Sequence, residues 1–248
     1  MIKCSKFMGG LLAAAAFAGL ASAQMEVGGT RHPVLTEVTL SDGNRTSFVV
    51  GDGAWGEVLA EMGIMRGEDR SRDREIAEQL YNSRNEIPAA YLFEAARRYA
   101  SFDPDQAVYV FFLARGRSLY DALRCLDSTA TNGVPIVTDM AGGEVASFMN
   151  ITDDGQSFAN VTRMQAALDR LQENGEIFTG QFTPWWICSA SDSVYIAATN
   201  SAPMPENEWL KPREVWPSAQ RMVEQNMARN RALLAVTIGA RDLEADSE

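Results

Sequence analysis

The residue types that most often carry chemistry are scarce in this chain. It has one histidine, His32, and three cysteines, of which Cys4 lies close to the N-terminus. A Ser-His-Asp or Cys-His mechanism would have to use His32, and nothing beside it resembles a nucleophile elbow. Two remaining cysteines and one histidine are too few for a convincing zinc site. We therefore expect no metal, no cofactor and no catalytic residue that the sequence can single out.

The acidic residues offer a weaker chemical possibility. There are 33 of them, so some carboxylates must lie close together, but no spacing marks a pair suited to glycoside hydrolysis. The sequence also contains no P-loop, no dinucleotide-binding glycine pattern and no H-E-x-x-H. A hydrolase that uses acidic residues stays open as an alternative function.

The first 23 residues have the pattern of a secretory signal peptide. Lys3 and Lys6 give a positive start, a short apolar stretch ends at Leu20, and Ala21-Ser22-Ala23 is an A-x-A cleavage site. The apolar stretch is too short for a membrane span. We expect cleavage after Ala23, which makes the protein periplasmic or secreted.

Cys125 and Cys188 are the two cysteines that remain after this cleavage. In an oxidising compartment two such cysteines most simply form a disulfide. The alternative is a redox or nucleophilic thiol. Cys188 follows Trp185-Trp186-Ile187 and has no basic neighbour in sequence to lower its pKa, and neither cysteine belongs to a C-x-x-C pair. We therefore predict a structural Cys125–Cys188 bridge.

The charge of the expected mature chain is strongly acidic. Without Lys3 and Lys6 it has 20 basic and 33 acidic residues, a net charge near −13. Nucleic-acid binding is disfavoured, because its affinity comes from Lys and Arg that neutralise phosphates. The excess of acidic residues either keeps the protein soluble or forms a face that binds a basic partner.

The pattern of apolar residues predicts a mainly α-helical fold with a small N-terminal β-hairpin. A flexible stretch is expected at 24–33. In residues 34–50 apolar and polar side chains alternate around a turn, which predicts a β-hairpin. Helical spacing begins at 54–63 and 68–82, and Pro88 starts a stronger helix. Asp103 is expected to cap the next helix, with Pro104 as its first residue and Gln106 at the capping-box position; Gly116 could break or kink it.

The second half of the chain has weaker signals between two clear helices. Residues 127–143, rich in Thr, Gly and Pro, indicate a loop, and 193–198 favour a strand. Helices are predicted at 156–174, closed by Asn174-Gly175, and at 217–235, where the methionines are interpreted as core filler. We expect one mainly helical domain over 34–241 and a disordered acidic tail over 242–248.

One segment resembles a Sel1-like or tetratricopeptide-type helical hairpin. The matching positions are Ala90, Leu92, Ala96, Tyr99, Asp105, Ala107, Phe111, Ala114, Ala122 and Leu126. Small residues let two helices approach closely while aromatic rings fill the space between them. No second copy follows at a fixed period, so a solenoid is not supported. The resemblance implies a helical-hairpin bundle and peptide binding by Tyr91, Arg98, Arg115 and Arg117.

Two groups of residues are candidate binding surfaces. The first is Arg97, Arg98, Arg115 and Arg117, which form either a solvated helix face or a site for an anionic peptide. The second is Trp185 and Trp186 with Trp209 and Trp216. These rings either pack in the core around the disulfide or form an exposed hot spot or sugar-stacking face.

The function that these features favour is binding without catalysis. We expect an exported protein that binds another protein or peptide in the cell envelope, with no nucleic-acid partner and no transmembrane segment in the mature chain. One specific version is an immunity-type inhibitor of a toxin that acts in the envelope. The alternatives are an envelope hydrolase and an assembly or structural factor of the envelope.

Overall fold

The computed structural model describes residues 29–39, 45–67, 69–149 and 155–245. Within them the chain is mainly α-helical with one two-stranded antiparallel sheet, which confirms the expected fold class. The expected signal peptide, residues 24–28 and the last three residues of the expected tail lie outside the described residues. No helix in the described part of the chain is long and apolar enough to span a membrane.

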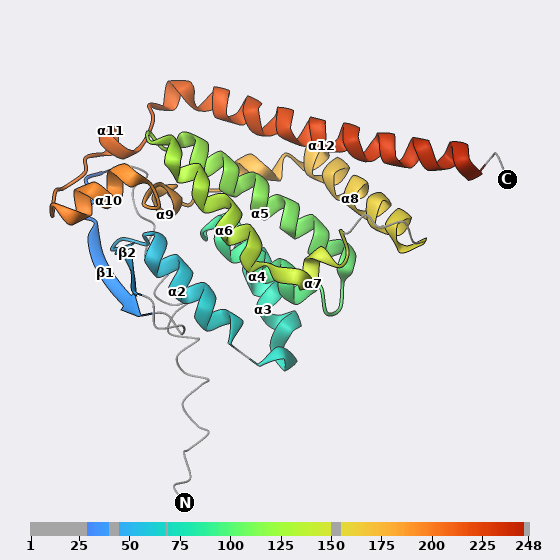
Figure 1. Ribbon diagram of the computed structural model, residues 1–248, viewed down its shortest axis with the longest axis horizontal. Helices are drawn as coiled ribbons and strands as arrows, with labels where there is room; N and C mark the ends of the chain where they lie inside the picture. The colour runs from blue at the N-terminus through green and yellow to red at the C-terminus, as the bar shows by residue number, and fades with distance from the viewer. Residues whose placement is uncertain (1–28, 40–44, 68, 150–154, 246–248) are drawn as a thin grey trace, which may run out of the picture.

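The elements follow one another along the chain as Figure 1 shows. In order they are β1 (Val34–Thr39), β2 (Arg45–Val50), α2 (Trp55–Arg66), η1 (Arg70–Arg72), α3 (Asp73–Asn82), α4 (Ala89–Tyr99), α5 (Pro104–Arg124), η2 (Ser128–Asn132), α6 (Gly133–Met140), α7 (Gly142–Ala146), α8 (Gly155–Asn174), η3 (Glu176–Thr179), α9 (Trp185–Cys188), α10 (Asp192–Thr199), α11 (Glu206–Trp209), η4 (Arg213–Val215) and α12 (Trp216–Ala245), where η marks a 3-10 helix.

The predicted hairpin is confirmed, and it rests on α2. β1 and β2 pair antiparallel with Val34 opposite Val50. Gly56 in the first turn of α2 allows the contact, because a Cβ there would lie 2.7 Å from the Cβ of Phe48 and 2.8 Å from the carbonyl oxygen of Val49. A lone hairpin is only marginally stable in water, so this contact gives it the support it needs.

The turn between the hairpin and α2 has an unusual backbone. Gly51, Asp52 and Gly53 all have positive φ angles, of 108°, 58° and 74°. The Glu57 carboxylate accepts hydrogen bonds from the N–H of Gly51 at 3.0 Å and of Gly53 at 2.8 Å. A side chain of α2 therefore holds the turn that precedes its own helix.

Part of the stretch expected to be flexible is anchored. Arg31 and Met204 exchange two backbone hydrogen bonds, of 2.7 and 2.8 Å, and the Arg31 side chain is buried. The guanidinium lies over the rings of Trp185 and Trp209 at 5.7 and 5.5 Å. The prediction of flexibility is therefore wrong for these residues. Their pairing partner, Met204, lies about 170 residues away along the chain, so the local sequence could not indicate the pairing.

α4 and α5 form the predicted helical hairpin at the centre of the molecule. The Asp103 carboxylate caps α5 by accepting from the N–H of Gln106 at 3.0 Å, as the sequence predicts. Phe93 of α4 meets Phe111 of α5 edge to face, with ring centroids 5.7 Å apart. α5 is continuous through Gly116, which instead leaves room for Ile177: a Cβ there would lie 2.7 Å from Ile177 Cδ1.

The predicted loop at 127–143 is wrong, because η2, α6 and α7 occupy most of it. The Asp127 carboxylate starts the first of these turns by accepting from the N–H of Thr129 at 2.9 Å. Pro135 falls in the first turn of α6, where the missing N–H of proline costs no helical hydrogen bond. Val134 and Val137 are buried, so tertiary packing turns a Thr-, Gly- and Pro-rich segment into helix.

The predicted strand at 193–198 is also wrong, because α10 takes its place. Its first amides have partners outside the helix: Asp192 N–H donates to Thr129 Oγ1 at 3.0 Å and Ser193 N–H to Asp127 Oδ2 at 2.9 Å. Strand propensity in Val194-Tyr195-Ile196 is overridden by these N-terminal hydrogen bonds.

The last two long helices lie side by side on α5. α8 confirms the predicted helix at 156–174, and Gly175 ends it in the left-handed conformation at φ 63°. α12 runs to Ala245, ten residues past its expected end, so residues 242–245 of the expected tail are helical. Figure 1 shows α12 crossing one side of the molecule and extending past α8.

The two glycines inside α2 give a matched test of the hairpin contact. Gly56→Ala is expected to lower the free energy of unfolding by about 1–3 kcal/mol, because the new methyl meets the Val49 carbonyl oxygen and the Phe48 Cβ of β2. At Gly63 a Cβ would have nothing within 4 Å, so Gly63→Ala is expected to raise the free energy of unfolding by up to about 1 kcal/mol through the better helix propensity of alanine. Urea titrations measure the free energy of unfolding of the two variants, and equal changes would contradict the packing described.

Candidate functional site

Six of the seven candidate binding residues lie in the interior. The buried ones are Tyr91, Arg97, Arg98, Arg117, Trp185 and Trp186, each at most 3% exposed. Only Arg115 of this set is exposed. The prediction that the arginines form a solvated face or a peptide site is therefore wrong for Arg97, Arg98 and Arg117. Of the four tryptophans, Trp185, Trp186 and Trp209 lie in the core, and Trp216 is half-buried.

The arginines of α4 belong to a buried charge cluster of Asp73, Glu94, Arg97 and Arg98. Glu94 accepts two hydrogen bonds from Arg97, both 2.7 Å, and one of 2.7 Å from Arg98 Nε. Arg98 Nη1 reaches Asp73 Oδ1 of α3 at 3.0 Å. Two carboxylates and two guanidiniums thus neutralise one another in the interior, as buried charges require.

The buried charge cluster ties four helices together. Arg98 Nη2 donates to the carbonyl oxygen of Met65 at the end of α2. Arg97 pairs with Glu144 of α7 at 3.3 Å, and Arg70 pairs with Asp73 at 2.8 Å. The hydrogen bonds that Arg97 donates to the Glu94 carboxylate are the main reason that the pKa of Arg97 is raised. These contacts fix α2, α3, α4 and α7 relative to each other.

Arg117 of α5 has a similar internal role. It donates to the carbonyl oxygen of Glu176 at 2.6 Å, to Asn85 Oδ1 at 2.7 Å and to Thr179 Oγ1 at 2.9 Å. Burial lowers its pKa to about 10. Because its donors are aimed at oxygens of this chain, Arg117 fastens η3 onto α5 and has no role as an accessible anion site.

The buried aromatic candidates are held by hydrogen bonds as well. The Tyr91 hydroxyl donates a hydrogen bond to the carboxylate of Glu61 on α2. Trp185 Nε1 donates to the Gly51 carbonyl oxygen at 3.2 Å, and Trp186 Nε1 to Asp121 Oδ2 at 2.8 Å. The sulfurs of Cys125 and Cys188 lie 2.07 Å apart beside these rings, so the predicted pairing is present and joins the end of α5 to α9.

A groove between α8, η3 and α12 is the candidate site that remains at the surface. Its volume is about 570 Å³, within the usual range for a ligand site. Buried Leu171 and Ile177 form its apolar floor. Half-buried Phe178 and Met227 add to the lining, and the other lining residues are Gln172, Gly175, Gln220, Glu224 and Ala228.

The groove is built by contacts already described. Gly175 turns the chain from α8 into η3, Ile177 packs on Gly116, and Arg117 fixes the η3 carbonyl. On the other side, Arg231 of α12 pairs with Asp169 of α8 at 2.5 Å and also donates to Gln172. The groove is therefore preformed between anchored elements.

The rim of the groove has one carboxylate. Glu224 is exposed and accepts a hydrogen bond of 2.8 Å from Gln220 Nε2, a turn earlier on α12. An exposed carboxylate beside an apolar floor can pair with a cationic group of a partner while apolar groups next to that cation cover the floor. The site thus offers shape, apolar surface and one negative charge.

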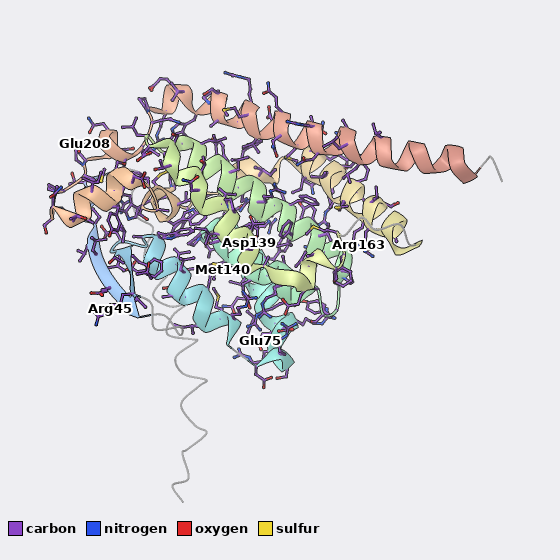
Figure 2. All side chains as sticks on the ribbon, in the orientation of Figure 1. Arg45, Glu75, Asp139, Met140, Arg163 and Glu208 are labelled. Atoms are coloured by element: carbon purple, nitrogen blue, oxygen red, sulfur yellow. A yellow bond between two sulfur atoms is a disulfide. The ribbon has the colours of Figure 1, made fainter. Side chains whose placement is uncertain are left out.

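A second hollow between α5 and α8 is less suited to a partner. Its volume is about 480 Å³, and its polar groups are already paired. Arg163, labelled in Figure 2, pairs with Asp105 at 2.5 Å, and Arg170 donates to Gln106 at 3.0 Å while lying over the Tyr109 ring. A ligand there would have to displace these contacts.

The sequence did not indicate the groove. The core-filler interpretation of the α12 methionines is wrong for Met222, which is 53% exposed, while Met227 packs partly against the core and also lines the groove. The available signal was Gly175 followed by apolar Ile177 and Phe178, which predicts a turn that must pack on something. Within the described residues, no group of three or more His, Cys, Asp or Glu side chains could hold a metal ion.

Comparisons with known proteins add no relative. The chain matches no protein-family model, and searches of curated proteins and of solved structures return no match. The α4–α5 hairpin is observed, but its kinship with the Sel1-like and tetratricopeptide families stays a prediction.

Two arginines from the predicted basic group give a matched test of the buried charge cluster. Arg98→Ala is expected to destabilise the fold by about 3–5 kcal/mol, because Asp73 and Glu94 lose a buried counter-charge. Arg115→Ala, at an exposed position, is expected to change it by less than about 0.5 kcal/mol. Denaturant unfolding measures both, and a mild Arg98→Ala phenotype would contradict the structural role.

The buried tyrosines predict a loss of stability at alkaline pH. Burial, then Glu61, raises the pKa of Tyr91; burial raises the pKa of Tyr109; and burial, then Glu78, raises the pKa of Tyr99 to about 12. The unfolded phenols ionise near their ordinary pKa of about 10, so the free energy of unfolding falls as pH rises through 10 towards 12.

This loss is measurable by unfolding titrations at stepped pH, with phenolate absorbance recorded in the folded protein. Tyr99→Phe is expected to lose less stability between pH 10 and 12 than the parent chain, because one delayed ionisation is gone. An identical pH dependence in the variant would show that Tyr99 contributes nothing to it.

Proposed function

We propose that this chain is an exported, non-catalytic domain that binds another protein of the cell envelope in the groove between α8, η3 and α12. The observation that carries the proposal is the groove itself: half-buried Phe178 and Met227 line it over buried Leu171 and Ile177, beside the exposed carboxylate of Glu224. Apolar cores with a polar rim are typical of protein interfaces.

Six of the seven side chains expected to bind a partner, all except Arg115, are absent from the surface, which supports this choice. Arg97, Arg98 and Arg117 satisfy their donors within the chain, and Trp185 and Trp186 are packed in the core. A partner that bound them would have to open the interior. The groove requires no such rearrangement.

The chemistry of the groove favours an occupant with apolar side chains next to a lysine or arginine. Apolar groups would cover the floor, and the cation would pair with Glu224. The acidic balance of the chain would steer such a basic partner towards it. An immunity-type inhibitor and an envelope assembly factor would both use a surface of this kind.

The export part of the proposal has two supports. The N-terminal sequence has the charge, apolar stretch and A-x-A site of a signal peptide. The pairing of Cys125 with Cys188 suits an oxidising compartment such as the periplasm.

The test uses protein purified from the periplasm of a bacterial host. Intact mass is expected to give a chain that begins at Gln24 and gains no alkylation without reductant. The mature protein is then used to capture partners from envelope extract. One stoichiometric partner is expected, bound at least about tenfold more weakly by Glu224→Lys and by Ala228→Trp, which put a wrong charge and a bulky ring in the groove.

Matched controls separate the groove from general surface effects. Glu208→Lys, on α11 and labelled in Figure 2, makes the same charge change outside the groove. Gln225→Trp adds the same bulk at an exposed α12 position that does not line it. Equal capture by all four variants would overturn the groove assignment. If the purified protein hydrolyses peptidoglycan fragments and a single Asp or Glu substitution abolishes that activity, the proposed binding function is wrong and the protein is a hydrolase.

A further inference from the structure

β1 is an edge strand whose outer side is open in the described part of the chain. β2 pairs with its inner side. Among the residues that the structure describes, no segment other than β2 exchanges a backbone hydrogen bond with Val34–Thr39. α10 contacts both strands, so it lies over the hairpin and not along this edge. Figure 1 shows β1 on the outside of the molecule, with β2 between it and α2.

The sequence of β1 does little to protect this edge from another strand. Edge strands are usually blocked by charged residues, a proline or a bulge. β1 reads Val-Leu-Thr-Glu-Val-Thr and pairs with β2 in a regular register. Its one charged residue, Glu37, already pairs with Arg45 of β2 at 3.3 Å. On one face of the strand Val34 and Val38 are 55% and 40% exposed, and Thr36 between them is exposed as well.

We propose that β1 pairs with β1 of a second copy of this chain, antiparallel about a two-fold axis at Thr36, so that the two hairpins form one continuous sheet. A second copy fits because the strand is complementary to itself. With the axis at Thr36, Val34 of each copy lies opposite Val38 of the other, and the two Thr36 side chains lie opposite each other. Cross-strand pairs of β-branched residues are favourable, and each contact occurs twice, as a two-fold interface requires.

The hydrogen-bond pattern of antiparallel strands selects this register. Residues directly opposite each other both point their backbone groups into the shared edge or both point them away, so the two-fold axis must pass at a residue. An axis at Thr36 pairs the whole segment from Val34 to Val38. An axis at Leu35 would pair only 34–36 before Pro33, which has no N–H, comes opposite. An axis at Glu37 would set two carboxylates against each other, which is destabilising.

The fold leaves room for the second copy. Neighbouring strands lie about 4.8 Å apart, so the two β2 strands would be about 14 Å apart across the new pair. α2 packs on β2, where Gly56 allows the close contact. The two α2 helices would therefore be separated by roughly the distance between the β2 strands, which exceeds the usual helix packing distance of about 8–10 Å. They do not collide.

This inference is independent of the proposed function. The groove is lined by residues of α8, η3 and α12, and no residue of the hairpin belongs to it. A dimer formed through β1 leaves both grooves open. Glu224→Lys, which is expected to weaken partner capture, is therefore expected to leave the pairing of two copies unchanged, so the two proposals can fail separately.

The first test is the molar mass of the mature protein, measured by light scattering and sedimentation over a wide range of concentration. A dimer that dissociates on dilution is expected. Val34→Lys combined with Val38→Lys is expected to raise the dissociation constant by about tenfold or more, because each lysine then lies opposite a lysine of the other copy. Val34→Lys combined with Val38→Glu places opposite charges there and is expected to recover most of the affinity. Both positions are exposed in one chain, and circular dichroism checks that the variants fold.

A cross-link tests the register. Opposite Cβ atoms in an antiparallel pair lie about 4.5–5.5 Å apart, so Thr36→Cys brings the two new thiols close enough for a disulfide across the axis. Mild oxidation is expected to give a covalent dimer of this variant, and Cys125 and Cys188 do not compete because they are already paired. Glu37→Cys is the matched control on the same strand. Its thiol would lie opposite Leu35 of the other copy, and no covalent dimer is expected.

The outcomes that overturn the proposal are specific. A chain that stays monomeric at every concentration does so, as does equal affinity of the two double variants. Cross-linking of Glu37→Cys in place of Thr36→Cys contradicts the axis at Thr36. Hydrogen exchange of the β1 amides is measured in the same samples. Protection that persists in the monomer at high dilution also overturns the proposal, because another segment of the same chain then covers the edge.

Discussion

The fold depends on the pairing of buried arginines with buried carboxylates on α3 and α4. Arg98 is inaccessible to water, and an ion of its size pays a desolvation cost of several kcal/mol unless partners replace the lost water. Glu94 and Asp73 supply that replacement at 2.7 and 3.0 Å, and the Met65 carbonyl takes a third donor. Because these partners come from three helices, the helices can satisfy the arginine in only one relative position.

The same principle explains which parts of the surface are left for recognition. Arg117 binds η3 oxygens, and Trp186 donates to Asp121, so polar groups that looked available in sequence are used to hold loops and helices together. The disulfide adds a covalent tie between α5 and α9 at the same place. Because these buried charges are satisfied within the chain, the apolar groove beside α12 is the surface that we assign to recognition.

The groove is fixed by contacts at both ends, through Arg231 on α12 and Arg117 below η3. A preformed groove gives selectivity at low entropic cost.

The sequence by itself determined the elements with local signals: the hairpin at 34–50, the Asp103 cap, the helix closed by Gly175, and the pairing of the two cysteines left after the expected leader. Each depends on neighbours in sequence or on simple counting. Tertiary structure alone decided that 127–143 and 193–198 are helical, since Asp127 stabilises both segments through hydrogen bonds to Thr129 and Ser193. It also decided that the arginines are internal. A run of charge is the same in sequence whether its partners are water or carboxylates from distant helices, and only the packing of those helices distinguishes the two.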